Sequence, residues 1–194
     1  MRTFHPDLTT AYDAATLWGA LPVTSRSSES AARIAACSSV TRLGPEHETQ
    51  FLELLLALDR ASRIARFGHP ISDASIIAYG KRALSTAAFV AGVFADDRVR
   101  GVVEVFEGND RKVPEVAFVV LQDWRRRGYC LALLAATALW AQQSGATTLR
   151  LIISRCNWPM RRLAEKVGAR FDLSLDEICA DFAVPEQQRD HVAA

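Results

Sequence analysis

The middle of the chain alternates between apolar runs and short polar breaks. Apolar runs cover residues 87–94, 99–106 and 115–121, and turn-like polar residues separate them at 95–98 and 107–110. Short β-rich segments joined by such turns are typical of antiparallel strands that follow one another in a sheet. We therefore predict a three-stranded antiparallel meander.

Helical patterns precede this meander. A short alternating segment at 40–43 predicts a strand, and Pro45 then suits the first turn of a helix with a broad apolar side. Two further helices are predicted over Arg60–Phe67 and 72–83, the second with Ser72 as its N-cap.

The carboxyl-terminal half returns to strands after one long apolar helix at Tyr129–Ser144. Next we predict a strand at 148–153, a helix at 160–167, and strands at 171–173 and 178–184. A meander followed by a strand–helix–strand crossover and a closing hairpin predicts a mixed α/β sheet.

The two ends of the chain lack this regularity. Residues 1–37 include a segment at 11–20 that predicts a short helix and a polar stretch at 25–30 with the composition of a linker. We interpret residues 1–37 as an N-terminal extension, residues 38–184 as one domain and residues 185–194 as a polar tail. Chain ends of this kind are often mobile.

Composition and charge narrow the class of protein. The chain has 194 residues, of which 49% are hydrophobic and 23% charged, which excludes a disordered chain. The net charge of +1 argues against bulk electrostatic attraction to nucleic acid or to a membrane. No apolar run reaches the ~18 residues of a transmembrane helix, and the N-terminus lacks the layout of a signal peptide. We expect a cytoplasmic protein.

Cysteine and histidine positions give no indication of a metal site. The four cysteines form no pair with the spacing of zinc ligands, and the four histidines are scattered. We expect no metal, and we interpret the cysteines as small apolar residues in a reducing compartment.

The most informative segment runs from the strand at 115–121 through a polar loop into the helix at Tyr129–Ser144. The first amides of a helix lack intrahelical partners and carry a partial positive charge, which suits a diphosphate. Gly128 allows close approach of the backbone, and Arg125, Arg126 and Arg127 add charge. A basic solvated turn that needs glycine for its geometry is the alternative. The segment lacks the Gly-Lys-Ser/Thr of a nucleotide-binding P-loop and the glycines of a dinucleotide fingerprint.

This arrangement resembles the Gcn5-related N-acetyltransferase family. That family carries Arg/Gln-x-x-Gly-x-Gly/Ala between its fourth strand and the next helix, and Arg125, Gly128 and Cys130 occupy those places. The segment from Asn157 to Phe171, with its Lys-Val-Gly, looks like the family's second motif. The resemblance covers about residues 40–184. Within it, the segment 59–67 looks most like bacterial protein-lysine acetyltransferase domains.

The resemblance implies a fold, a cofactor and site residues. The implied fold is a mixed, mostly antiparallel sheet with helices on both faces and a V-shaped split between the fourth and fifth strands. The implied cofactor is acetyl-CoA, whose pantetheine arm would bond to the backbone of Val119, Val120 and Leu121. Its diphosphate would lie on the loop and first helical turn, at Arg125, Arg126, Arg127, Gly128, Tyr129, Cys130 and Leu131. Asn157 would face the thioester end or the pantetheine arm, or would serve as an N-cap.

Two residues depart from the family pattern. Cys130 replaces the second small residue, where its amide stays available and its side chain adds some crowding. Ala164 stands where many relatives carry a tyrosine that acts as general acid, and Tyr129 is no obvious substitute.

Acetyl transfer to an amine needs a base more than an acid. An alkylammonium has a pKa of ~10.4 and cannot attack a thioester until a carboxylate or a water chain removes its proton. Glu115 matches the catalytic glutamate of the histone-acetyltransferase-like branch of the family, and Glu104 is its rival. If the turn is centred between Asn109 and Asp110, the two glutamates are cross-strand partners. Two facing carboxylates raise the pKa of one of the pair, which favours a base near neutral pH. The alternative is that both are solvent-facing strand residues.

These features lead to a main hypothesis and two alternatives. The main one is an N-acetyltransferase that moves an acetyl group from acetyl-CoA to a primary amine, on a protein lysine or on a small molecule. A catalytically weak acyl-CoA-binding or regulatory module would account for Cys130 and Ala164. A nucleic-acid-binding role for Arg125, Arg126 and Arg127 is disfavoured by the near-neutral charge, so we expect no nucleic-acid partner. The sequence leaves the oligomeric state open, although homodimers are common in the family.

Overall fold

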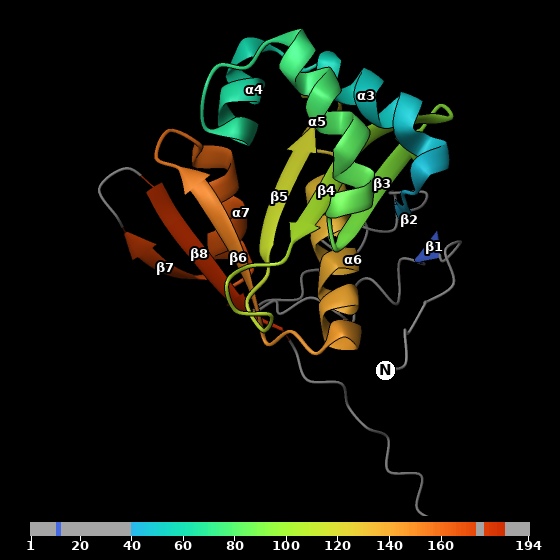
Figure 1. The fold of residues 1–194 in the computed structure, drawn as a ribbon. Coiled ribbons are helices and arrows are strands. Elements are labelled where there is room, and N and C mark those ends of the chain that lie inside the picture. Colours follow the sequence, from blue (N-terminus) through green and yellow to red (C-terminus); the bar gives the residue numbers. More distant parts are fainter. Residues whose placement is uncertain (1–10, 13–39, 174–176, 185–194) are drawn as a thin grey trace, which may run out of the picture.

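The protein is built on one mixed sheet with helices on both faces. The structure is a computed structural model that describes residues 11–12, 40–173 and 177–184. Within these residues the sheet has eight strands in the order β1-β2-β3-β4-β5-β6-β8-β7, and every neighbouring pair is antiparallel except β5 and β6 (Figure 1). The strands are β1 (Ala11–Tyr12), β2 (Val40–Arg42), β3 (Phe89–Ala95), β4 (Arg98–Phe106), β5 (Glu115–Val120), β6 (Thr148–Ser154), β7 (Arg170–Leu173) and β8 (Glu177–Ala183).

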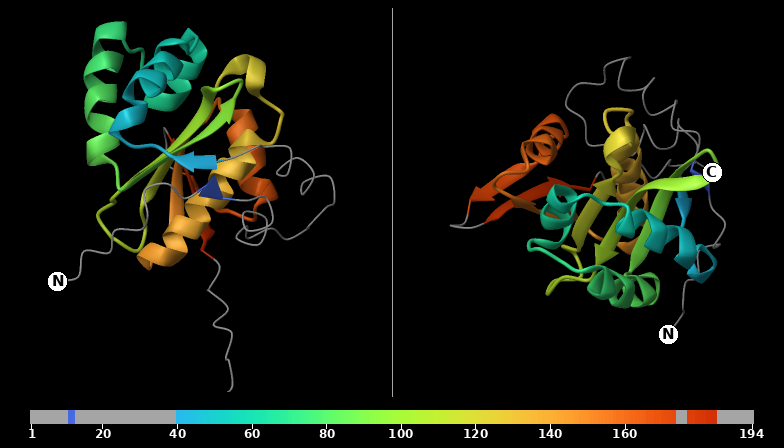
Figure 2. Two further views of the ribbon diagram at one scale, coloured as in Figure 1. Left: turned by 90° about the vertical axis from the view of Figure 1, so that its right-hand side faces the viewer. Right: turned by 90° about the horizontal axis from the view of Figure 1, so that it is seen from above.

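Helices lie on the two sides of this sheet (Figure 2). A 3₁₀ turn at Pro45–His47 leads into α3 (Glu48–Leu56), and α4 (Arg60–Phe67) and α5 (Asp73–Thr86) follow. On the other face lie α6 (Tyr129–Ser144), after a 3₁₀ turn at Gln122–Trp124, and α7 (Trp158–Lys166). None of the helices in the described ranges is both long and apolar enough to span a bilayer.

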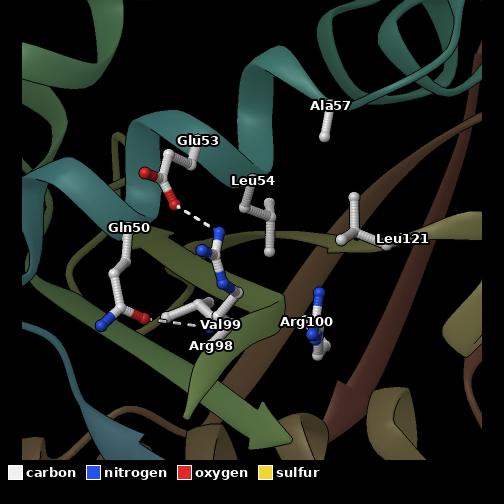
Figure 3. A pocket seen from close by; sticks show the side chains of 8 residues that line it. All are labelled: Gln50, Glu53, Leu54, Ala57, Arg98, Val99, Arg100 and Leu121. Carbon is white, nitrogen blue, oxygen red and sulfur yellow. Dashed lines mark hydrogen bonds and ion pairs between the residues drawn. The ribbon is translucent and has the colours of Figure 1, made fainter. Parts of the chain in front are cut away.

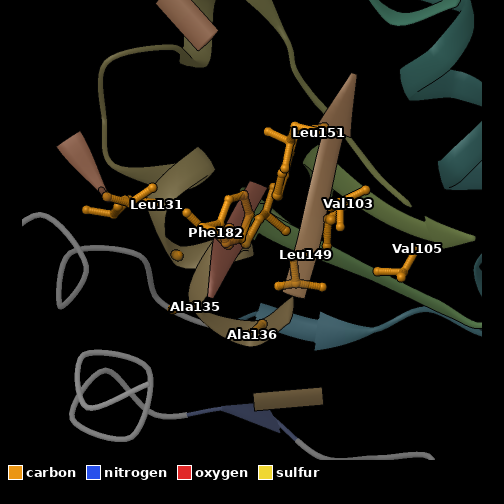
Figure 4. Packing of buried hydrophobic residues seen from close by; sticks show 14 of the residues in the cluster. Val103, Val105, Leu131, Ala135, Ala136, Leu149, Leu151 and Phe182 are labelled. Carbon is orange, nitrogen blue, oxygen red and sulfur yellow. The ribbon is translucent and has the colours of Figure 1, made fainter. Parts of the chain in front are cut away.

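The sheet lies between two apolar cores, one on each of its faces. The larger core joins α6 and α7 to one face of the strands, and Figure 4 shows side chains of α6 packed against β4, β6 and β8. The smaller core joins α3 and α5 to the opposite face of β3, β4 and β5. Helix α6 is apolar nearly all round because it is buried along most of its length, as expected for a helix enclosed by its neighbours.

The parallel pair β5–β6 separates after a short contact. Its register joins only Glu115 to Arg150 and Val116 to Leu151, and from Ala117 onward β5 has no pairing with β6. The two strands therefore diverge toward their carboxyl ends, where Figure 1 shows α4 above them. This is the split expected between the fourth and fifth strands, which are β5 and β6 here because β1 adds a strand.

Most predicted elements are confirmed, including the N-cap at Ser72, whose hydroxyl accepts the amide of Ser75. The helix expected over residues 11–20 is wrong at its start, because Ala11 and Tyr12 pair with β2 as a strand. Pairing with an open sheet edge satisfies backbone groups that an isolated short helix would leave to water. The remainder of that segment, the polar stretch at 25–30 and the tail at 185–194 lie outside the described residues.

Candidate active site

Within the described residues, the loop before α6 leaves the first turn of the helix without a side-chain cap. Gly128 is the N-cap of α6 with φ +89°, a left-handed conformation that a side chain strains. No side chain in the described part of the chain caps this end, and the first described intrahelical bond runs from the amide of Ala132 to Gly128 O. The first turn of α6 therefore provides the anion-binding arrangement of a helix N-terminus.

Three contacts of the Trp124 ring hold the loop. Two guanidinium groups lie over the Trp124 ring, with the central carbon of Arg100 4.6 Å and that of Arg127 4.5 Å from its centroid. Trp124 also stacks on Tyr129 at 6.2 Å between ring centroids. Tyr129 is buried, so its ring packs the loop against the body of the domain rather than facing the cleft.

Arg125 makes two side-chain hydrogen bonds to other parts of the protein. Its Nε donates to Val120 O at 3.1 Å, and its Nη2 donates to the Ser62 hydroxyl on α4 at 2.6 Å. The expectation that this guanidinium adds charge near the diphosphate stays a prediction, and the structure adds these two contacts within the protein to it. Arg126 is exposed and has φ +62°, so its backbone contributes to the sharp turn of the loop.

Backbone direction separates the three residues expected along the pantetheine arm. The amide of Leu121 donates to Arg100 O, and Val119 pairs with Val102 of β4 in the same ladder. Leu121 and Val119 therefore turn their backbone groups toward β4. Since backbone groups alternate along a strand, Val120 turns its polar groups toward the gap beside β6. Of these three residues, Val120 therefore presents backbone to the split, and its carbonyl already accepts Arg125 Nε.

A cavity of about 440 Å³ opens on the α4 side of the split. Glu115 lines this cavity at the first residue of β5, where β5 is still paired with Arg150 of β6, two residues before the strands part. Phe67, Phe106 and Ile152 give the same cavity apolar walls. The rest of its lining is Ala65, Arg66, Gly68, Val116, Ala117, Ser154 and Glu177.

A second, smaller cavity of about 90 Å³ lies between α3 and β4 (Figure 3). An ion pair from Arg98 to Glu53 at 3.3 Å crosses it, and the Gln50 side chain accepts the amide of Val99 at 3.1 Å. These contacts hold α3 against the edge of β4, so we assign this cavity a packing role.

Comparison with known proteins agrees with this geometry. A sequence model described as the acetyltransferase (GNAT) family matches residues 53–169, more than half of the chain. The chain belongs to the acetyltransferase (GNAT) family. The family uses acetyl-CoA. No curated protein matches the sequence.

Solved structures of other GNAT proteins share the fold. The GNAT domain of S. lividans PAT has a TM-score of 0.65 and 16% identity over 75% of this chain and 89% of that chain. PaiA N-acetyltransferase from Thermoplasma acidophilum, in complex with coenzyme A, has a TM-score of 0.57 and 16% identity, covering 74% and 97%. A GNAT-family acetyltransferase from Bacillus anthracis has a TM-score of 0.60 and 12% identity, covering 75% and 93%.

The expected opposition of two glutamates in this GNAT domain is wrong. Phe106 pairs with Glu115, and Glu104 pairs with Ala117. The residue opposite Glu104 is therefore two positions further along β5 than Glu115. The turn between β4 and β5 is centred one residue later than expected, with Asp110 accepting the amides of Val113 and Lys112 through its carbonyl and carboxylate.

Glu104 has a structural role instead. It is fully buried, and its carboxylate accepts hydrogen bonds from Arg66 Nη2 and from the Tyr79 hydroxyl. Burial lowers the pKa of the Arg66 guanidinium, but Glu104 and Tyr79 more than offset this and raise it overall. Burial, followed by the Glu104 charge, raises the pKa of Tyr79. A carboxylate enclosed in this way cannot reach a substrate amine, so Glu104 is corrected from candidate base to partner of a buried ion pair.

The remaining residues singled out in the sequence lie on α6 and at or within α7. Asn157 is the N-cap of α7, with its side-chain oxygen accepting the amide of Met160 at 3.3 Å. This is the second of the two roles expected for this residue. Cys130 packs against the larger core, and burial raises the pKa of its thiol to about 12, so it is an unreactive thiol at neutral pH. Leu131 is buried in that core and can offer only its amide, and Ala164 is buried beside it.

Sequence reasoning gave no role to Ser62, Arg66 and Tyr79. Ser62 and Arg66 are four residues apart, so they share one face of α4. Ser62 and Arg66 therefore form a polar pair on one face of a helix with few apolar residues. This pattern could have indicated that polar partners hold the helix.

Proposed function

We propose that this protein transfers an acetyl group from acetyl-CoA to a primary amine, with Glu115 as the proton acceptor. The observation that carries the proposal is the position of Glu115 in the wall of the 440 Å³ cavity, two residues before β5 and β6 part. Membership of the GNAT family supports the use of acetyl-CoA.

The residues present fit this cofactor. The uncapped start of α6 behind the left-handed Gly128 suits the diphosphate, with the amides of Cys130 and Leu131 in the first helical turn. The gap beside Val120 suits an extended arm that bonds to a strand edge. When bound, acetyl-CoA supplies an acetyl group activated as a thioester.

Glu115 would then make the amine reactive. An alkylammonium with a pKa of ~10.4 is protonated at neutral pH, so the carboxylate must take a proton from it, directly or through one water. With that proton on Glu115, the neutral nitrogen would be free to form the C–N bond to a thioester carbon as its C–S bond breaks, and the second proton lost from nitrogen would pass to the departing thiolate. A thiol leaving group with a pKa near the ~8.5 of cysteine departs without a strong acid, which agrees with the absence of a hydroxyl at Ala164.

The cavity walls support an amine on an aliphatic stem. Phe67, Phe106 and Ile152 provide apolar surface beside Glu115, and Ile152 is 45% exposed before any substrate binds. A methylene chain gains free energy by covering such surface while its amino group reaches the carboxylate. Lysine side chains and small alkylamines both have this form.

Glu115→Gln tests the proposal, with Glu107→Gln as the matched control on an exposed residue just beyond β4. We expect kcat with an alkylamine to fall by about 10²–10⁴-fold in Glu115→Gln, with CoA affinity by calorimetry unchanged. The Glu107 variant keeps both values. Unchanged turnover in Glu115→Gln would remove this residue from the role of base, and CoA binding without acetylation of any amine in a panel would favour the acyl-CoA-binding module.

A further inference from the structure

Helix α4 is held to the protein mainly by polar contacts, together with Phe67, which packs against the smaller core and the Tyr79 ring. Its single buried residue is Ser62, whose residue surface is 7% exposed. By contrast, α3 and α5 bury several apolar side chains each. The position of α4 therefore depends on the partners of a few hydrogen-bonding groups.

Ser62 links the N-terminus of α4 to the cofactor loop. Its amide and its hydroxyl each donate to the Asp59 carboxylate at 2.8 Å, which caps the helix. The same hydroxyl accepts Arg125 Nη2 at 2.6 Å, and Arg125 Nε holds Val120 O at the end of β5. One continuous chain of hydrogen bonds thus runs from the cap of α4 to the first residue of the loop that precedes α6.

The other end of α4 forms a wall of the acceptor cavity. Ala65, Arg66, Phe67 and Gly68 line it, beginning three residues after Ser62. Arg66 anchors this end through Glu104 and Tyr79. Since the helix has eight residues and a regular hydrogen-bond ladder, a shift at Ser62 is transmitted to the wall.

We propose that Arg125 and Ser62 are positioning residues that couple occupation of the cofactor loop to the placement of α4 and so to the acceptor cavity. The inference rests on the proposed function, because it requires CoA to bind this loop. Coenzyme bound to the loop fixes Arg125, Arg125 fixes Ser62, and α4 holds the cavity wall in place beside Glu115.

The chemistry of the link accounts for arginine at position 125. A guanidinium presents N–H groups in a fixed fork, so it can hold Val120 O and the Ser62 hydroxyl together. A lysine keeps the charge without that geometry. Ser62→Ala removes the central hydroxyl and leaves the loop and the Asp59 cap on the Ser62 amide intact.

Hydrogen exchange with and without CoA tests the coupling. In the wild-type protein we expect CoA to slow amide exchange both in the loop at 125–131 and in α4, the latter by at least ~5-fold, the lower end of typical coupling factors. In Ser62→Ala and in Arg125→Lys, the loop keeps its protection and α4 loses the CoA-dependent part. The double variant should lose no more than either single variant.

Ser85→Ala and Arg82→Lys are the matched controls. Both residues are exposed on α5, and both variants should behave as the wild type. Protection of the loop alone in the wild-type protein overturns the coupling and leaves the proposed function standing. Protection of α4 that persists in Ser62→Ala overturns the assigned link. Lack of protection in both segments of the wild type overturns the proposed function, and the coupling with it.

Discussion

The helices on the two faces of the sheet are held in different ways. Helix α6 is fixed by ten buried residues, most of them leucine and alanine, packed on the strands. Helix α4 has one buried residue and is fixed by Asp59, Ser62, Arg63 and Arg66 through hydrogen bonds and ion pairs. Apolar packing is non-directional and tolerant, whereas a hydrogen-bonded anchor demands one geometry. The cofactor side is thus fixed by apolar packing, and the acceptor side is fixed by specific polar contacts.

The largest expected effect comes from breaking the buried pair under α4. Arg66→Met leaves the fully buried Glu104 carboxylate without its cation, which should cost about 3–5 kcal/mol of unfolding free energy. Urea denaturation measures this, with the exposed Arg82→Met as control. Adding Glu104→Leu to Arg66→Met should recover much of the loss, and a double variant no more stable than the single one would contradict the assignment.

A comparable loss should follow from opening the larger core. Leu149 is fully buried between β6 and α6, so Leu149→Ala should cost about 2–5 kcal/mol in the same denaturation experiment. Ile152→Ala, on the opposite face of the same strand and 45% exposed, is the matched control and should cost far less. Equal losses in the two variants would argue against the assignment of the two faces of β6.

The two helices differ in how much of their structure the sequence predicts. Both were expected at their observed positions, but the contacts that hold α4 were not. The long apolar segment at Tyr129–Ser144 predicted α6 with both ends correct, because a helix buried on nearly all sides is apolar along its own sequence. The parallel β5–β6 split and the cofactor followed from the resemblance at Arg125, Gly128 and Cys130. The anchors of α4 were missed since their partners are far away in sequence, with Arg66 and Glu104 38 residues apart and Ser62 and Arg125 63 residues apart.

The position of Glu104 shows the same limit. Its strand was predicted correctly, but the register of β4 against β5 depends on the conformation of the eight residues between them, which local composition leaves open. A shift of one residue in the centre of that turn moves Glu104 from opposite Glu115 to opposite Ala117. Candidate residues on a hairpin are therefore less predictable than the hairpin itself.

The two ends of α6 offer a further test on the cofactor side. Gly128 and Gly145 both have left-handed φ, +89° and +79°, so alanine at either position should cost about 1–2 kcal/mol of stability. Gly128→Ala should also weaken CoA binding by about tenfold, because its backbone borders the predicted diphosphate position. Gly145→Ala, where an added Cβ meets no atom within 4 Å, should leave CoA affinity unchanged. Equal affinities in both variants would separate Gly128 from the cofactor.

The smallest expected effect concerns the acid stability of the α4 cap. Hydrogen bonds from the amide and hydroxyl of Ser62, and the charge of Arg125, lower the pKa of Asp59 in the folded protein. Because the folded value lies below the unfolded one of about 3.9, the contribution is complete above that pH and is lost as pH falls through the folded value. Asp59→Asn should therefore lose less stability than the wild type between pH 5 and about pH 3. An identical acid dependence in denaturation curves of the two proteins would show that this cap contributes nothing.

Titration of CoA into the purified protein in a calorimeter tests the central claim most directly. The account predicts a saturable heat with one CoA per chain, weakened in Gly128→Ala and retained in Glu115→Gln. A titration that gives no heat at millimolar CoA would contradict the assignment of the α6 N-terminus and the β5–β6 split as an acetyl-CoA site.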